Sequence, residues 1–98
     1  MEDLQFPAAY LVTYDLGQPI EKYAPFFDEL MRSYKWSHYI QNTWIVLRYD
    51  QLIDFVPKLR PLIFQSDRLL VMPAKGPGDG WLPIEAWQWM TENVPNEW

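Results

Sequence analysis

The alternation of apolar and polar residues divides the chain into segments typical of strands and helices. Residues 10–16 (YLVTYDL) are β-branched and aromatic and end at a carboxylate before the Gly-Gln-Pro breaker at 17–19, which predicts a strand. The apolar residues that follow recur at helical spacing. They predict a helix from about Ala24 to Tyr34, with Pro25 in its first turn, where the missing N–H costs nothing.

The middle of the chain predicts two paired strands. Residues 36–41 alternate between apolar and polar side chains, and residues 44–49 (WIVLRY) are β-branched and aromatic. The Asn-Thr pair at 42–43 interrupts the apolar pattern between them. These segments form either a hairpin or a single bent strand pair.

A second helix and a fourth strand complete the pattern. Asp50 is suited to cap the N-terminus of a helix that is short or kinked, because Pro57 and Pro61 each lack a backbone N–H. Residues 68–72 (RLLVM) then form an apolar strand that is bounded by Pro73. The resulting order is βαββαβ. It predicts an α+β, ferredoxin-like fold with two helices on one face of a four-stranded antiparallel sheet.

The C-terminal part of the chain has a character of its own. Residues 74–80 are rich in Pro and Gly and predict a linker. In the segment 81–98 we expect a docked helix over residues 81–94, whose buried face comprises Ile84, Trp87, Met90 and Val94. The 98 residues therefore predict one domain, with a ferredoxin-like body at 9–73 and an acidic, Trp-rich C-terminal helix.

Charge and composition limit the classes of function that the sequence supports. The formal net charge is −5, and residues 76–98 carry four acids and no Lys or Arg. Strong nucleic-acid binding usually requires a basic face, so this balance counts against it. The candidates for a phosphate-contacting patch are scattered along the sequence and are Arg48, Lys58, Arg60, Arg68 and Lys75.

The absence of cysteine excludes disulfides, Cys-ligated zinc and thiol nucleophiles. The acidic start of the chain does not resemble a secretion signal, and no apolar run approaches ~18 residues. We therefore expect a cytoplasmic protein without a membrane partner.

Asp15 is the main candidate for site chemistry, because one His and no Cys leave few alternatives. It could bind Mg²⁺ as one of two symmetry-related carboxylates, since Mg²⁺ needs only one or two protein carboxylates plus phosphate. The alternative is that Asp15 caps the following turn through its side chain. Ser37 and His38 are neighbours on a strand and point to opposite faces, so they do not form a nucleophile and base pair. We expect His38 to be a surface or sheet-face residue.

Tryptophans could stack on nucleic-acid bases as they do in single-strand binders. They are not interleaved with Arg and Lys, which favours core and interface packing instead. The residues concerned are Trp36, Trp44, Trp87 and Trp89.

The order of features resembles a known group of proteins. The shared features are a strand ending YDL, a helix, a β-pair with Gln41, Thr43 and Trp44 across its bend, a second helix, and Asp67 before an LLV strand. They resemble the small ferredoxin-like, endoribonuclease-like proteins of CRISPR adaptation, and among these the short chains often labelled SinR-like. The resemblance covers about residues 9 to 73, and the acidic tail departs from it.

The resemblance implies a homodimer in a prokaryotic or phage (antiviral) defence context. Asp15, which follows Tyr14 at the end of the first strand, would meet its twin across the dimer axis and hold a divalent metal such as Mg²⁺. Gln41 and Thr43 match the family's Gln and small hydroxyl residue. Members of such a family include metal-dependent endonucleases acting on RNA or DNA and also non-catalytic scaffolds. The implied functions are thus an endoribonuclease or a dimeric adaptor or acidic inhibitor whose tail binds a protein partner; no other cofactor is expected.

Overall fold

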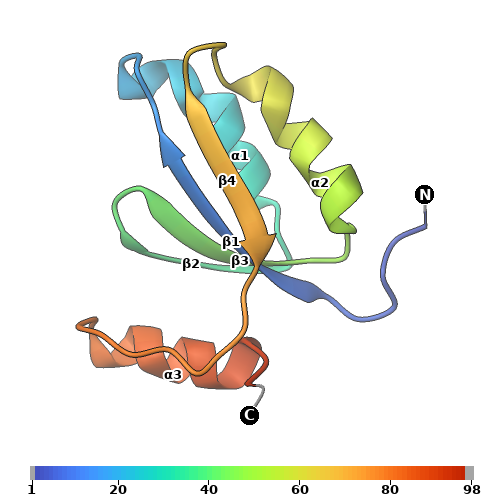
Figure 1. Ribbon diagram of the computed structural model, residues 1–98, viewed down its shortest axis with the longest axis vertical. Coiled ribbons are helices and arrows are strands. Elements are labelled where there is room, and N and C mark those ends of the chain that lie inside the picture. Colours follow the sequence, from blue (N-terminus) through green and yellow to red (C-terminus); the bar gives the residue numbers. More distant parts are fainter. Residues whose placement is uncertain (1, 97–98) are drawn as a thin grey trace.

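Four strands pair into one antiparallel sheet in the order β2-β3-β1-β4, as the computed structural model shows for residues 2–96 (Figure 1). The strands are β1 (Ala8–Asp15), β2 (Lys35–Ile40), β3 (Thr43–Arg48) and β4 (Arg68–Pro73). The helices are the 3-10 helix η1 (Ile20–Tyr23), α1 (Ala24–Met31), α2 (Leu52–Leu59), the 3-10 helix η2 (Arg60–Leu62) and α3 (Ile84–Asn93). This arrangement confirms the predicted α+β, ferredoxin-like fold with a C-terminal helix.

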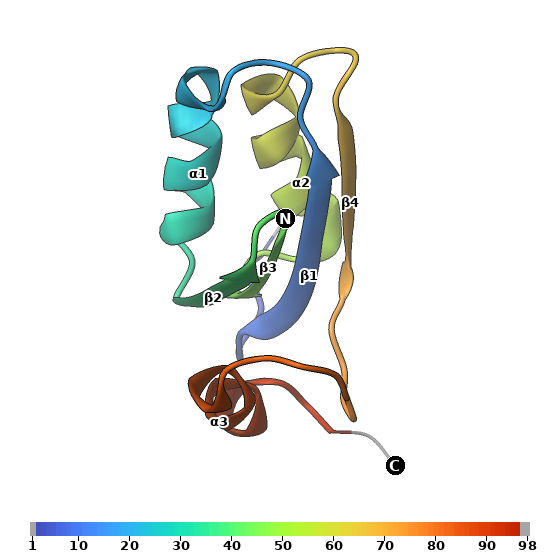
Figure 2. The same cartoon turned by 90° about the vertical axis from the view of Figure 1, so that its left-hand side faces the viewer.

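The two faces of the sheet carry different layers. Figure 2 shows α1 and α2 together on one side of β1 and β4, while α3 lies across β2 and β3 from these two helices. In β1, Tyr10, Val12 and Tyr14 point to the helix face, and Leu11 and Thr13 between them point to the opposite face. We call the second face the α3 face.

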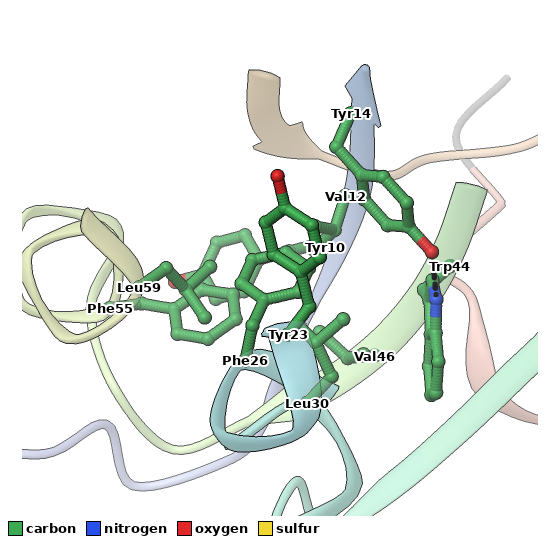
Figure 3. Close-up of a cluster of buried hydrophobic side chains, with 10 residues drawn as sticks. All are labelled: Tyr10, Val12, Tyr14, Tyr23, Phe26, Leu30, Trp44, Val46, Phe55 and Leu59. Carbon is green, nitrogen blue, oxygen red and sulfur yellow. Dashed lines mark hydrogen bonds between the residues drawn. The ribbon is translucent and has the colours of Figure 1, made fainter. Parts of the chain in front are cut away.

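The core lies between the helix face of the sheet and helices α1 and α2 (Figure 3). Aromatic rings make up much of it. Tyr10 stacks on Phe55 of α2 with centroids 5.6 Å apart, and Tyr14 meets Phe26 of α1 edge-on at 5.3 Å. The cluster comprises Tyr10, Val12, Tyr14, Tyr23, Phe26, Leu30, Trp44, Val46, Phe55 and Leu59.

Helix α1 begins at Ala24 as predicted but ends at Met31, so the predicted end at Tyr34 is wrong. The backbone N–H of Tyr34 donates to the carbonyl of Leu47 at 2.9 Å, which starts the pairing of β2 with β3. The apolar spacing alone does not separate these outcomes, because a residue at the start of a strand can coincide with the helical period. The second helix is short, as predicted, and Pro57 lies inside it before η2 begins.

Asp50 does not cap α2, and that prediction is wrong. The N-cap residue is Gln51, which makes no side-chain capping hydrogen bond. The carboxylate of Asp50 instead binds Arg48 at 3.1 and 3.2 Å and Lys58 at 2.6 Å. Burial alone would raise the pKa of Asp50, but hydrogen bonds from Arg48 and Lys58 outweigh it and lower the pKa. Arg48 is buried and also binds Glu29 of α1 at 3.0 Å, so Arg48 and Lys58 are not free to form a phosphate patch.

The C-terminal segment packs on the α3 face as predicted, but its helix covers Ile84–Asn93 and not the predicted 81–94. Ala86 is 1% exposed, and its small side chain lets the helix approach the sheet closely. Trp87, Met90 and Val94 are partly buried, but Ile84 is 68% exposed, so its predicted place on the buried face is wrong. The helix is rotated so that positions 86, 87, 90 and 94 face the sheet. Within residues 2–96, no helix is both long enough and apolar enough to cross a membrane.

Candidate functional site

A hollow of about 560 Å³ lies where β1 ends, beside α1 and the turn between β2 and β3. We call it the β1 hollow. Its apolar lining comprises Leu16, Ile20, Phe27, Met31 and Trp44. Its polar lining comprises Tyr14, Asp15, Gln18, His38, Gln41 and Asn42. The size and the mixture of an apolar base with a few polar groups are typical of small-ligand sites.

Three of the four residues singled out by sequence meet here. Tyr14, Asp15 and Gln41 all line the β1 hollow. Thr43 does not: its hydroxyl is 3.1 Å from that of Thr13, and it lines a separate hollow beside α3. Thr43 is therefore on the α3 face, where it joins β1 and β3.

Asp15 is exposed at the end of β1, and within residues 2–96 its carboxylate makes no hydrogen bond or ion pair. Its partner in the β1–β4 register is Arg68. The turn after β1 is held by another carboxylate, that of Asp67, so the capping role considered for Asp15 belongs to Asp67. Within residues 2–96, the side chain of Asp15 therefore makes no polar contact that stabilises the fold.

Asp67 accepts three hydrogen bonds of 2.8 Å. They come from the backbone N–H of Gly17, the backbone N–H of Phe64 and the hydroxyl of Tyr23. Burial would raise the pKa of Asp67, but these hydrogen bonds favour the ionised form and lower the pKa. Asp67 thus connects the loop after β1, η1 and the loop before β4.

Tyr14 connects the end of β1 to the β2–β3 turn. Its hydroxyl accepts a hydrogen bond from Nε1 of Trp44 at 3.0 Å (Figure 3) and donates one to the carbonyl of Gln41 at 3.2 Å. Its backbone N–H donates to the carbonyl of Asn42 at 3.1 Å. Burial raises the pKa of Tyr14 above its usual value, so the hydroxyl stays protonated near neutral pH.

His38 is exposed, as expected for a surface residue, but it has a defined position that sequence reasoning missed. Its ring stacks on Trp44 at 4.1 Å between centroids and 13° between planes, and its Nε2 is 3.0 Å from the carbonyl of Gln41. A carbonyl only accepts, so Nε2 carries the proton and Nδ1 of the neutral ring keeps a free lone pair. The hairpin pairs Ile40 with Thr43 and would by itself place Tyr39 opposite Trp44. The register shift between Ser37 and Ile40 brings His38 beside Trp44 instead, and the sequence pattern does not signal that shift.

The charge around the β1 hollow is acidic. Neither Lys nor Arg lines it among the residues of 2–96, and Asp15 is its carboxylate. In the same range, no group of three or more His, Asp or Glu side chains could hold a metal ion. The described lining therefore offers a cation such as Mg²⁺ a single carboxylate, that of Asp15.

Helix α3 has two hollows along its sides on the α3 face. One, of about 440 Å³, lies towards β4 and includes Met72 and Val94; the other, of about 180 Å³, lies towards the β2–β3 hairpin and includes Tyr39 and Leu82. Both are mainly apolar and share Trp87 and Met90 in their lining. They carry no concentration of titratable groups comparable to that of the β1 hollow.

Comparisons with known proteins add no further information on the site. No protein-family model, curated protein or solved structure matches this chain. The site is therefore interpreted from its own geometry and chemistry.

Proposed function

We propose that this protein is a homodimeric, nucleic-acid-associated protein of a prokaryotic or phage defence context, with endoribonuclease activity that depends on a divalent metal. The observation that carries the proposal is that the carboxylate of Asp15 is exposed and unpaired within residues 2–96. Asp15 lines one hollow with Tyr14 and Gln41. Asp67 performs the structural role that Asp15 could otherwise have had.

The metal chemistry is the ordinary chemistry of Mg²⁺. When bound, Mg²⁺ would neutralise phosphate charge and supply an activated water. Asp15 of each protomer would hold it, because one or two carboxylates suffice when phosphate and water complete the shell. Tyr14 and the backbone of Gln41 keep the end of β1 and the β2–β3 turn in a fixed relation around that carboxylate.

The exposed surface supports a dimer. A folded monomer of 11.8 kDa is expected to expose about 5,900 Å². This chain exposes 6793 Å², which exceeds that expectation, and its large exposed side chains include Tyr39, Ile40 and Leu70. Light scattering after gel filtration measures the mass directly, and a clean monomer at tens of micromolar would remove the paired-Asp15 mechanism.

The test of the nuclease proposal uses Asp15→Asn beside Asp28→Asn, a matched change at an exposed carboxylate on α1. Mg²⁺ or Mn²⁺ should raise the Tm of the wild type and of Asp28→Asn but not that of Asp15→Asn. Cleavage of single-stranded RNA should require the metal and Asp15. Cleavage that persists in Asp15→Asn, or a metal effect that is equal in both variants, contradicts the proposal.

A second candidate is a non-catalytic dimeric adaptor or acidic inhibitor that binds a protein partner. The observation that favours it is that Arg48 and Lys58 are already engaged by Asp50 while large apolar side chains are exposed. Trp81 is 98% exposed and Leu70 is 54% exposed. Salt-dependent RNA or DNA binding separates the two candidates, because the nuclease requires it and the adaptor does not.

A further inference from the structure

We propose that the β1 hollow receives a single unpaired nucleobase, which stacks on the open face of His38. This inference rests on the proposed function, because it names the form of nucleic acid that the same site would take. It adds a binding role for His38, Gln18 and Asn42, which neither the sequence analysis nor the proposed function assigned.

The ring of His38 is the outer member of an aromatic stack. Phe27 packs on Trp44 at 6.2 Å and 21°, and His38 packs on Trp44 at 4.1 Å and 13°. Trp44 is 4% exposed, so its faces are covered, whereas His38 is exposed. The hydrogen bond to the carbonyl of Gln41 fixes the ring in this position. A flat ligand would extend the stack without first having to order the side chain it stacks on.

The polar groups of the hollow can both donate and accept. The side-chain amides of Gln18, Gln41 and Asn42 make no hydrogen bond within residues 2–96, and each offers an N–H donor and a carbonyl acceptor. A nucleobase presents donors and acceptors side by side on one edge, and this mixture matches amides. A guanidinium or ammonium group presents donors only and would leave the amide N–H groups unmatched.

The charge of the hollow decides which part of a nucleotide enters. No Lys or Arg lines it within residues 2–96, and a phosphate beside Asp15 without a cation would meet like-charge repulsion. The neutral base is therefore the part that fits inside. The neighbouring phosphate would then lie at the rim with Asp15, where the proposed function places the cation. A base in a duplex cannot stack on His38, so the site selects single-stranded nucleic acid.

The experiment uses uncharged nucleosides in EDTA, so that neither phosphate nor metal contributes. The chain contains one His, and its imidazole signals in NMR spectra report on the β1 hollow without ambiguity. Adenosine, guanosine, cytidine and uridine at millimolar concentration should shift these signals. For at least one nucleoside, the shift should reach a plateau as its concentration is raised. Agmatine, which carries a guanidinium, should not shift them.

Three variants test the assignment. In His38→Ala, nucleoside affinity, followed through the side-chain amide signals of Gln18 and Asn42, should fall by about tenfold or more, as expected for one lost stacking contact. His38→Phe keeps a flat ring and should retain most of the affinity. Tyr39→Ala changes an exposed aromatic residue of the same strand that lines the hollow beside α3, and it should bind as the wild type does.

The inference is overturned if no nucleoside shifts the His38 signals, if agmatine shifts them and nucleosides do not, or if His38→Ala binds nucleosides unchanged. The outcome is independent of cleavage. A protein that binds nucleosides but neither cleaves RNA nor responds to Mg²⁺ contradicts the nuclease proposal alone. A protein that cleaves RNA through Asp15 but ignores nucleosides contradicts this inference alone.

Discussion

Two carboxylates near the end of β1 have opposite roles at the scale of single residues. Asp67 accepts three hydrogen bonds, one of them from Gly17, which is 50 positions away in sequence. Asp15 accepts none within residues 2–96. The sequence places both residues at the edge of a strand, and only the folded geometry assigns the structural role to Asp67.

We expect the loss of folding stability at acidic pH to depend on Asp67. Because its pKa is lower in the folded chain than the ordinary value of 3.8, its contribution is complete above that value and is lost as the pH falls through the folded pKa. Asp67→Asn should therefore lower the Tm at pH 7 and flatten its decline below about pH 5. Thermal denaturation at a series of pH values measures this. Asp28→Asn is the control, and equal profiles for the two variants would refute the role of Asp67.

The hydroxyl of Tyr14 should stabilise the site more than an ordinary tyrosine hydroxyl does. In Tyr14→Phe the indole N–H of buried Trp44 loses its acceptor, and we expect the free energy of unfolding to fall by about 2 kcal/mol. Tyr10→Phe is the control, because the hydroxyl of Tyr10 donates to the carbonyl of Asp50 and leaves no buried donor unpaired when removed. Urea denaturation compares the two, and a cost for Tyr14→Phe no larger than that for Tyr10→Phe would contradict the prediction.

At the scale of secondary-structure elements, the pattern of apolar residues predicted the type and order of strands and helices, because period-2 and helical patterns reflect which face is buried. Boundaries and polar roles were harder to predict. Tyr34 fits the helical period but belongs to the strand pairing, and Asp50 is a good capping residue type that binds Arg48 and Lys58 instead. Tyr34 pairs with Leu47, and Asp50 pairs with Arg48 at the end of β3 and with Lys58 in α2; these contacts exist only once the strands and α2 are in place.

Arg48 should be the most important polar link between elements. Its guanidinium binds Asp50 and Glu29 and lies 4.3 Å above the ring centroid of Phe55, so it joins β3 to both helices of the core. Arg48→Met removes the buried partner of Asp50 and Glu29 and leaves them only the more exposed Lys58 and Arg32, so it should cost about 3 kcal/mol of unfolding free energy. Arg32→Met is a matched control, because Arg32 also binds Glu29 but is exposed; its cost should stay below about 1 kcal/mol. If chemical denaturation gives similar losses of unfolding free energy for Arg48→Met and Arg32→Met, the prediction is wrong.

At the scale of the whole molecule, the sequence predicted part of the candidate site. Tyr14, Asp15 and Gln41 meet in the β1 hollow, since a strand end and a hairpin turn lie close together in this topology. Thr43 points to the other face, because one step along a strand reverses the side chain. His38 was missed because its role depends on stacking across the hairpin rather than on neighbours in sequence.

Docking of α3 should contribute measurably to the stability of the entire domain. Ala86 is 1% exposed against the α3 face, so Ala86→Asp places a charge and extra volume where the helix meets the sheet. We expect the free energy of unfolding to fall by about 3 kcal/mol and the Tm by roughly 10–20 °C. Ile84→Asp adds the same charge at a position of α3 that is 68% exposed and should leave the Tm nearly unchanged. Deletion of residues 77–98 should destabilise at least as much as Ala86→Asp and change the number of chains per particle measured by light scattering, because the deletion uncovers Leu11 and Ile45 beneath the helix. If Ala86→Asp and the truncated chain both melt as the wild type does and keep its number of chains per particle, α3 does not contribute to the stability of the fold.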